Sequence, residues 1–233
     1  MKTFHIKYIL FYLGMAIAPV SCGIDNFDEP DTSFSGRIVY EEQPVQVRHG
    51  EVRFQLWQPG FGNPGPIEVP VNQDGSFSTL LFKGEYKLVF VNNAGPFRTE
   101  IVNEAQRDTI YVNLDGKKTL DVSVIPYFTV ENAQFSLSGN TVNAGCNIRQ
   151  VVNGEESRQV ERVTLYLNST AFVSDNDLEN YARADADIQD PSVITVSADI
   201  PEDNTRSYVF ARIGVKISGV ESLIFSPVQK LEL

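Results

Sequence analysis

Apolar and polar residues alternate with a period of two in short runs along most of the chain after residue 35. This period places successive side chains on opposite faces of an extended strand, so that one face meets a core and the other meets water. In the clearest run, Val52, Phe54 and Leu56 alternate with charged and polar neighbours. Further runs occupy residues 86–90, 110–114, 120–124 and 208–217. The chain is therefore predicted to be all-β.

Turn-forming residues separate the predicted strands. Gln73-Asp74-Gly75 and Lys83-Gly84 end two of the runs, and glycine tolerates the backbone angles that tight turns need. Asp115-Gly116 lies between two alternating runs, and this dipeptide favours the two-residue turn of a hairpin. We therefore expect a hairpin at residues 115–116.

Ile125-Pro126-Tyr127 interrupts the strand pattern near the middle of the chain. Because proline cannot donate to a strand ladder and restrains the residue before it, a sheet edge or a linker is expected there. We predict a first β-sandwich over residues 34–126 and a second one, immunoglobulin- or fibronectin-like, over residues 127–233. Each would have the usual size of such a domain, about 100 residues.

Residues 174–186 depart from the strand pattern of the second predicted domain. Ser174 is a good N-cap residue, and Asp177 would place a carboxylate in the first helical turn. We expect a short exposed helix in this segment.

The N-terminal segment has the features of a bacterial lipoprotein signal. Two lysines precede an apolar stretch at residues 8–20, which is too short to span a bilayer, and Ser21-Cys22-Gly23 follows. A small residue before cysteine resembles the lipobox, in which the thiol is acylated and becomes the new N-terminus. Pro19 stands where leucine is usual, so a plain secretory signal is the alternative. We predict a signal peptide at residues 1–21, lipidation at Cys22 and an acidic tether at residues 22–33.

Charge and cysteine content narrow the classes of partner and of fold. The formal net charge of −11 would repel nucleic-acid phosphates, so nucleic acid is not an expected partner. Cys22 and Cys146 are the two cysteines, and a lipidated Cys22 leaves Cys146 without a disulfide partner. Cys146 is expected to serve as a small buried apolar side chain, and the cores must hold the fold.

Three short motifs resemble a known domain. They are Ser35-Gly36-Arg37-Ile38-Val39, Asp74-Gly75-Ser76-Phe77 and Gly84-Glu85-Tyr86-Lys87-Leu88. Together they resemble the transthyretin-like or carboxypeptidase-regulatory-like domain. The resemblance implies that Gly75 forms a turn and that Phe77 returns to the core.

A longer pattern resembles a lipoprotein family of the Bacteroidota, domain of unknown function 3823. It joins Asp25-Asn26-Phe27-Asp28 after Cys22, residues 57–63, Arg212-Ile213-Gly214 and Ser226-Pro227. The resemblance implies a two-domain surface lipoprotein of the outer membrane. It also implies a genetic association with starch-utilisation-type outer-membrane transporters and their glycan-binding lipoproteins. The family has no established chemistry.

Enzyme chemistry has little support in the residues. His49 is the single histidine after residue 22, and no nucleophile elbow accompanies it. Zinc sites need several histidine or cysteine ligands. The transthyretin-like hydroxyisourate hydrolases end in a tetrapeptide that residues 230–233 do not match. We predict a protein that is not an enzyme and has neither a cofactor nor a metal; a glycosidase using paired carboxylates is a minor alternative.

The segment from Asp175 to Asp190 is rich in carboxylates and begins like a calcium loop. Asn180 and Ala186 stand where an EF-hand needs glycine and glutamate. A solvated segment is favoured, with an adventitious calcium site as the alternative. Asp108-Thr109-Ile110 resembles a short O-glycosylation motif of exported Bacteroidota proteins.

The candidate ligand-binding residues are Trp57, Phe61 and Asn63. Trp57 precedes a loop at residues 58–66 that contains three prolines and three glycines. Strand alternation places the Trp57 side chain on the face of the strand that is turned away from Phe54 and Leu56. Exposed aromatic rings beside amides can stack on sugars or anchor protein interfaces. The alternative is that Trp57 and Phe61 cover the end of the sandwich as an apolar lid.

These observations favour a non-enzymatic, lipid-anchored protein of the cell envelope. We expect it to bind glycan, or to act as an accessory subunit, in a polysaccharide-uptake system. Its expected partners are the membrane, through the lipid, polysaccharide and components of an outer-membrane transporter. A structural adhesin or assembly protein is the alternative, and a weak hydrolase is the third hypothesis.

Overall fold

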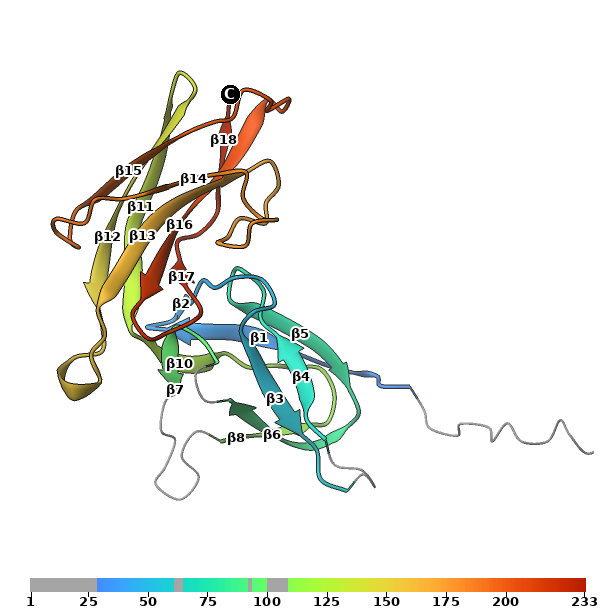
Figure 1. The fold of residues 1–233 in the computed structure, drawn as a ribbon. Helices are drawn as coiled ribbons and strands as arrows, with labels where there is room; N and C mark the ends of the chain where they lie inside the picture. Colours follow the sequence, from blue (N-terminus) through green and yellow to red (C-terminus); the bar gives the residue numbers. More distant parts are fainter. Residues whose placement is uncertain (1–28, 61–64, 92–93, 100–108) are drawn as a thin grey trace, which may run out of the picture. The chain divides into compact units, whose positions relative to one another are not determined.

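The computed structural model describes residues 29–60, 65–91, 94–99 and 109–233 (Figure 1). Cys22, Phe61 and Asn63 lie outside the described residues. Residues 31–233 form one compact unit, and its described secondary structure is almost all strand. In the part of the chain that the structure describes, no helix is long and apolar enough to cross a membrane.

The first half of this unit contains two sheets. The six-stranded sheet consists of β1 (Thr32–Tyr40), β2 (Gln43–Pro44), β5 (Ser76–Leu81), β7 (Phe97–Thr99), β9 (Lys118–Thr119) and β10 (Val122–Pro126). The four-stranded sheet has the order β4 (Ile67–Pro70), β3 (Arg53–Trp57), β6 (Gly84–Phe90) and β8 (Ile110–Leu114), and all its pairs are antiparallel. The two sheets pack face to face through aromatic side chains, with the ring centroids of Phe54 and Phe77 4.8 Å apart.

The predicted alternation in β3 is confirmed. Phe54 and Leu56 are fully buried and lie opposite Phe90 and Leu88 of β6. Arg53 and the other intervening residues face outward. The period of two therefore sets both the core of the first half and the composition of its outer face.

Two glycines of the family-like motifs have clear structural reasons. Gly75 has a φ of +80° in a turn that the Asp74 carboxylate closes by accepting hydrogen bonds from Ser76. Gly36 lies where β1 passes under a neighbouring carbonyl, and a Cβ there would come within 1.8 Å of the Leu120 oxygen. Phe77 is buried, as the resemblance implied.

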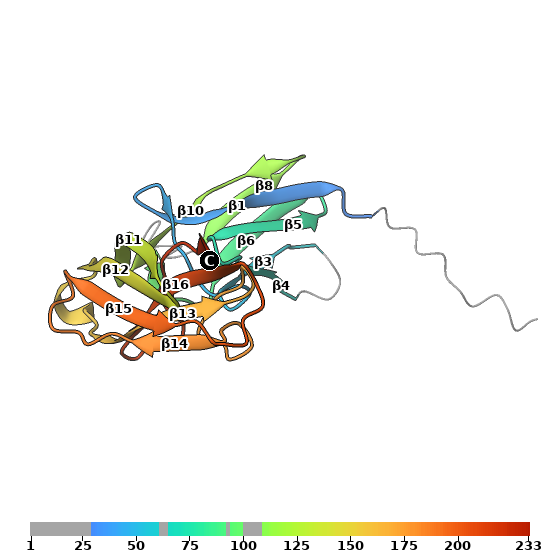
Figure 2. The same cartoon turned by 90° about the horizontal axis from the view of Figure 1, so that it is seen from above.

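The second half contains two further sheets. The three-stranded sheet has the order β11 (Phe128–Ser138), β12 (Thr141–Gln150) and β15 (Ile194–Asp199). The five-stranded sheet consists of β13 (Val160–Asn168), β14 (Ala182–Asp185), β16 (Tyr208–Ile217), β17 (Ile224–Phe225) and β18 (Gln229–Glu232). Figures 1 and 2 show the strands of the two halves gathered in separate groups. The protein is thus an all-β chain of two β-sandwiches.

The central strand β16 is buried on both faces. Its residues Val209, Ile213 and Val215 have no exposed surface and belong to the main core. On the opposite face, Arg212 is equally buried beneath a small cluster formed by Tyr166, Val173, Leu223 and Phe225.

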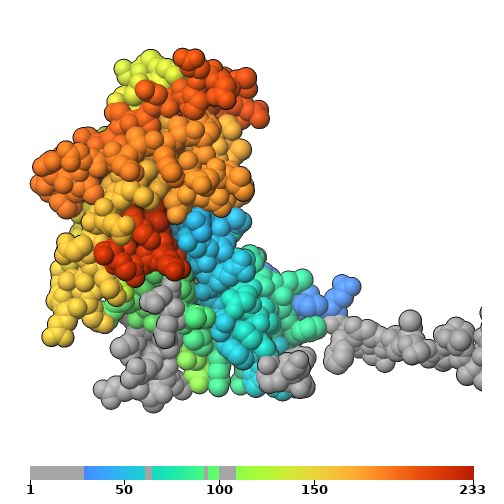
Figure 3. All heavy atoms as spheres, in the orientation of Figure 1, coloured from blue at the N-terminus to red at the C-terminus, as the bar shows by residue number. Residues whose placement is uncertain are grey.

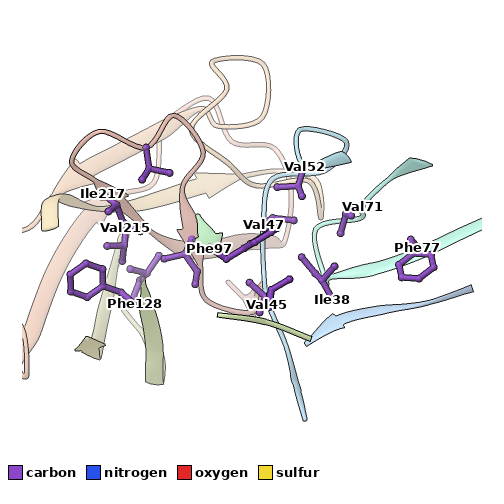
Figure 4. Packing of buried hydrophobic residues seen from close by; sticks show 14 of the residues in the cluster. Ile38, Val45, Val47, Val52, Val71, Phe77, Phe97, Phe128, Val215 and Ile217 are labelled. Carbon is purple, nitrogen blue, oxygen red and sulfur yellow. The ribbon is translucent and has the colours of Figure 1, made fainter. Parts of the chain in front are cut away.

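The apolar core is continuous between the two halves. Figure 4 shows Ile38, Val45 and Val47 of the first half with Phe128 and Val215 of the second half in the same cluster. The two sandwiches therefore share part of their buried apolar surface, which favours a fixed junction over a free linker.

The helix expected at residues 174–186 is absent. The segment forms turns followed by β14, and the short helical element of the second half is instead a 3-10 turn, η1 (Gly154–Glu156). Ser174 and Asn176 accept hydrogen bonds from nearby backbone N–H groups, and the Asn180 amide donates to two backbone carbonyls. These local bonds satisfy the backbone without a helix.

The expected hairpin at residues 115–116 is also wrong. The strand before the turn, β8, pairs with β6, whereas β9 and β10 after it pair with β1 in the other sheet. Asp115-Gly116 therefore marks a crossing from one sheet to the other, with Gly116 at a φ of +130°.

Cys146 is buried in β12, as expected of a small apolar side chain. Burial raises the pKa of its thiol to about 11. The thiol is therefore protonated at neutral pH and is a poor nucleophile there.

Candidate functional site

Trp57 is exposed on the outer face of the four-stranded sheet. It is the last residue of β3, and 37% of its surface is accessible. Its indole Nε1 donates to the side-chain oxygen of Gln55 at 3.2 Å, and the Gln55 amide donates to Glu68 at 2.7 Å. These bonds hold the indole beside a row of polar groups on the same face.

A second aromatic side chain lies on the same row of the sheet. Trp57 is opposite Lys87 of β6, and Lys87 is in turn opposite Tyr111 of β8. Tyr111 is 56% exposed, and the Lys87 ammonium lies 5.8 Å from the centre of its ring. Because neighbouring strands lie about 4.8 Å apart, the two aromatic positions are about 9.6 Å apart across the sheet.

We refer to the outer surface formed by Gln55, Trp57, Glu68, Lys87 and Tyr111 as the Trp57 face. It combines two exposed rings with an amide, a carboxylate and an ammonium group. A flat aromatic ring can cover the C–H face of a sugar, while the polar groups can bond its hydroxyls. The same chemistry also suits a protein interface.

Tyr111 did not emerge from the sequence as a candidate residue. The alternation of Ile110, Val112 and Leu114 already placed Tyr111 on an outward face. What the sequence lacked was the strand order, which brings β8 to within two strands of Trp57. The other predicted site residues, Phe61 and Asn63, lie outside the described residues.

The His49 ring packs against a neighbouring aromatic side chain. Its ring lies 5.2 Å from that of Phe172, in an edge-on arrangement. Across the described ranges, no three histidine, cysteine, aspartate or glutamate side chains are grouped in a way that could hold a metal ion.

Three carboxylates in the segment from Asp175 to Asp190 contact different partners. Asp175 pairs with Arg48 and Asp177 with Arg183, while Asp190 accepts hydrogen bonds from Ser192. Thr109, the residue of the glycosylation-like motif, precedes β8 and is half-buried.

Comparisons with known proteins identify the family. A model described as the N-terminal domain of a protein of unknown function, DUF3823, matches residues 32–125, and a DUF3823 C-terminal domain model matches residues 128–230. A solved DUF3823 family protein from Parabacteroides merdae is 35% identical, with a TM-score of 0.75, over 88% of this chain and 100% of that one. The chain belongs to the DUF3823 family.

Two further solved structures are similar to this DUF3823 protein. A family member from Bacteroides ovatus is 30% identical, with a TM-score of 0.75, over 87% of this chain and 100% of that one. A protein from Bacteroides uniformis, whose description proposes carbohydrate binding, is 19% identical with a TM-score of 0.66, over 88% of this chain and 100% of that one. At this identity the likeness shows the fold alone. A search of curated proteins found no match.

The Arg212-Ile213-Gly214 and Ser226-Pro227 motifs of this DUF3823 protein meet at the junction of its halves. The Arg212 guanidinium donates to the backbone carbonyls of Ser226 at 2.8 Å, Val173 at 3.2 Å and Gln73 at 2.8 Å. It also lies 4.3 Å from the ring centre of Phe225. Because Gln73 belongs to the first half, one buried side chain joins three separate segments of the fold.

Further contacts strengthen the same junction. The Phe225 backbone N–H donates to the Gln46 carbonyl, and the Gln73 amide donates to the Ala171 carbonyl. In the space-filling view, the red segment that contains β17 lies against the blue segment of the first half (Figure 3). The two family motifs near the C-terminus therefore stabilise the contact between the halves. They do not form part of the Trp57 face.

A polar group at the edge of the junction includes a buried carboxylate. Arg48 bridges Glu51 at 3.0 Å and Asp175 at 3.3 Å. One Glu51 oxygen is buried without a hydrogen-bond partner, and burial raises the pKa of this carboxyl, although Arg48 opposes the shift. The ion pair of Arg48 with Asp175 thus adds a charged link between the halves.

Proposed function

We propose that this DUF3823 protein is a non-enzymatic, lipid-anchored protein of the cell envelope that binds glycans with its Trp57 face. The observation that carries the proposal is the outward position of Trp57 and Tyr111, in one row with Lys87 between them. Tryptophan and tyrosine side chains usually bury much of their surface, so two exposed rings in one row of a sheet are candidates for a binding surface. The carbohydrate binding that is proposed for the Bacteroides uniformis relative agrees with this function.

The proposed mechanism is presentation of a binding surface. Lipid at Cys22 would hold the protein at the outer membrane, and the acidic residues up to 33 would give the sandwiches reach. The Trp57 face would then hold polysaccharide for an outer-membrane transporter. The junction around Arg212 would keep the two sandwiches in one orientation during this contact.

Replacement of Trp57 tests the glycan hypothesis. We expect Trp57→Ala to abolish retention of the purified protein on polysaccharide-containing native gels, and Tyr111→Ala to weaken it. Both side chains are exposed, so the free energy of unfolding should change by less than about 1 kcal/mol. Leu80→Ala is the matched control, because Leu80 is an exposed apolar residue of the other sheet.

Two results would contradict the proposal. If every polysaccharide that retains the natural protein also retains Trp57→Ala, the Trp57 face does not bind glycan. A loss of stability of about 3 kcal/mol or more would assign Trp57 a core role. Co-purification with envelope proteins that survives Trp57→Ala, in the absence of any polysaccharide binding, would favour the adhesin hypothesis.

A further inference from the structure

A cleft of about 270 Å³ lies between the two sandwiches, away from the Trp57 face. Its lining comes from the β1–β2 turn of the first half and from β11, β12 and β17 of the second. The buried side chains of Val45, Ile224 and Phe225 provide an apolar floor. The rim is polar, and its members are Glu41, Gln43, Thr129, Glu131 and Arg149.

Arg149 organises the rim of this cleft. Its guanidinium donates to Glu131 at 2.5 Å and to Glu41 at 3.1 Å, and it lies 5.8 Å from the ring centre of Tyr40. The pKa of Glu131 is lowered, chiefly by its hydrogen bond with Arg149. Glu131 also accepts from the Thr129 hydroxyl at 3.0 Å. The rim is therefore a connected set of donors and acceptors drawn from both sandwiches.

Two backbone irregularities flank the cleft. Glu41 and Glu42 form the two-residue turn between β1 and β2, with φ values of 49° and 65°. Such turns favour Asn-Gly, because side chains with a Cβ are strained at positive φ. On the other side, β11 has an irregular register between Glu131 and Gln134, with Asn132 at a φ of 51°. Strained turns and bulges of this kind gather at binding sites.

The chemistry of the lining indicates the class of ligand. An apolar floor with a few converging polar groups at its edge is the usual form of a small-molecule site, and junctions between domains are a common place for it. The volume is near the lower end for such sites and suits a single ring. Two carboxylates surround the one guanidinium, so a further anion would be repelled whereas hydroxyl groups could bond to each member.

We propose that this cleft binds one neutral sugar unit, either a free monosaccharide or the end of a chain. The site is separate from the Trp57 face and does not depend on it. Its floor would cover the apolar face of the ring, while Arg149, Glu131 and Thr129 would bond to its hydroxyls.

Ligand-observed saturation-transfer NMR on the purified full chain tests this site. The probes are glucose, galactose, mannose, xylose and N-acetylglucosamine, with glucuronate as the anionic comparison. We expect saturation transfer to the ring protons of at least one neutral sugar and none to glucuronate. Arg149→Gln should weaken the affinity at least tenfold, and Thr129→Val should weaken it severalfold.

Matched variants separate a loss of binding from a loss of fold. Arg162→Gln removes another exposed arginine pair, and Thr141→Val removes another strand hydroxyl that bonds a carboxylate. Both should bind as the natural protein does. Unchanged melting temperatures of Arg149→Gln and Thr129→Val would show that the cleft variants are folded, and either one alone suffices if the other is unstable.

Three outcomes would overturn the proposal. They are no transfer to any neutral sugar, equal transfer to glucuronate, or unchanged binding in every cleft variant that is folded. Trp57→Ala distinguishes the two sites. If it removes the monosaccharide signal, the sugar binds at the Trp57 face and the cleft proposal fails, although the proposed function stands. If it removes polysaccharide retention alone, the two sites are independent.

Discussion

Arg212 shows how one charged residue can be accommodated with no exposed surface. Its described hydrogen-bond partners are backbone carbonyls, and the Phe225 ring lies over the guanidinium. Burial lowers the pKa of Arg212 to about 9, which leaves the group charged at neutral pH. A buried charge is costly unless its donors are satisfied, so these carbonyls must stay in place for the fold to be stable.

Arg212→Lys should therefore destabilise the protein although it keeps the charge. An ammonium group lacks the planar fork that reaches separate carbonyls and stacks on Phe225. Carbonyls left without a donor cost about 1–3 kcal/mol each, so we expect a loss of about 3 kcal/mol in the free energy of unfolding. Urea denaturation followed by circular dichroism measures it. Arg162→Lys at an exposed pair should change stability by less than about 0.5 kcal/mol, and equal effects of both changes would contradict this role of Arg212.

Single residues could be assigned from the sequence where strand alternation decides their environment. The outward position of Trp57 follows from it, whereas the burial of Cys146 was expected from the absence of a disulfide partner and from the usual role of a free cysteine as a small apolar side chain. The same rule fails for Arg212, which alternation in β16 places on the solvent side of the sheet. Its cover comes from the segments around Val173 and Phe225 and from a loop of the other half, and no local pattern contains that information.

At the scale of elements, strands were predicted more readily than their connections. The expected helix at 174–186 and the expected hairpin at 115–116 both rested on short local signals. In the first case Ser174 and Asn180 made hydrogen bonds that replace those of a helix, and in the second the chain changed sheets. Turn residues indicate where a strand ends, whereas the choice of the next partner depends on the packing of the whole sandwich.

The β1–β2 turn gives a prediction at this scale. Glu42→Gly should raise the free energy of unfolding by about 1 kcal/mol, because glycine adopts a φ of 65° without the strain of a side chain. Glu41 is kept, so its contact with Arg149 should persist. Thermal melting or urea denaturation provides the measurement.

Glu42→Ala is the control for the turn. Alanine has a Cβ and should not relieve the strain, so this variant should not gain stability. A gain of equal size in both variants would attribute the effect to the loss of the glutamate charge.

At the scale of the whole molecule, the sequence indicated two sandwiches and the change of pattern near Pro126. The strands of the first two sheets end at Pro126, and those of the other two begin at Phe128. What the sequence did not indicate is how closely the halves are joined. Gln46, Gln73 and Arg48 have no pattern that marks them as contacts to residues more than a hundred positions away.

The proposed anchor gives a prediction for the whole protein. Cys22→Ala should move the protein from the membrane fraction to the soluble fraction and abolish incorporation of labelled palmitate, because acylation needs the thiol of Cys22. Cys146→Ala is the matched control, since that thiol is buried in β12, and it should keep both the label and the membrane location. Free solubility of the natural protein, without label, would contradict lipid anchoring.

The sole tryptophan and Cys146, the free cysteine among the described residues, lie in different sandwiches. Indole fluorescence therefore monitors the first sandwich. Alkylation of Cys146 monitors the second, because the thiol reacts only when unfolding exposes it. The indole therefore reports on one side of the junction, and the Cys146 thiol reports on the other. If both signals change at the same denaturant concentration, the shared core makes the two sandwiches a single cooperative unit.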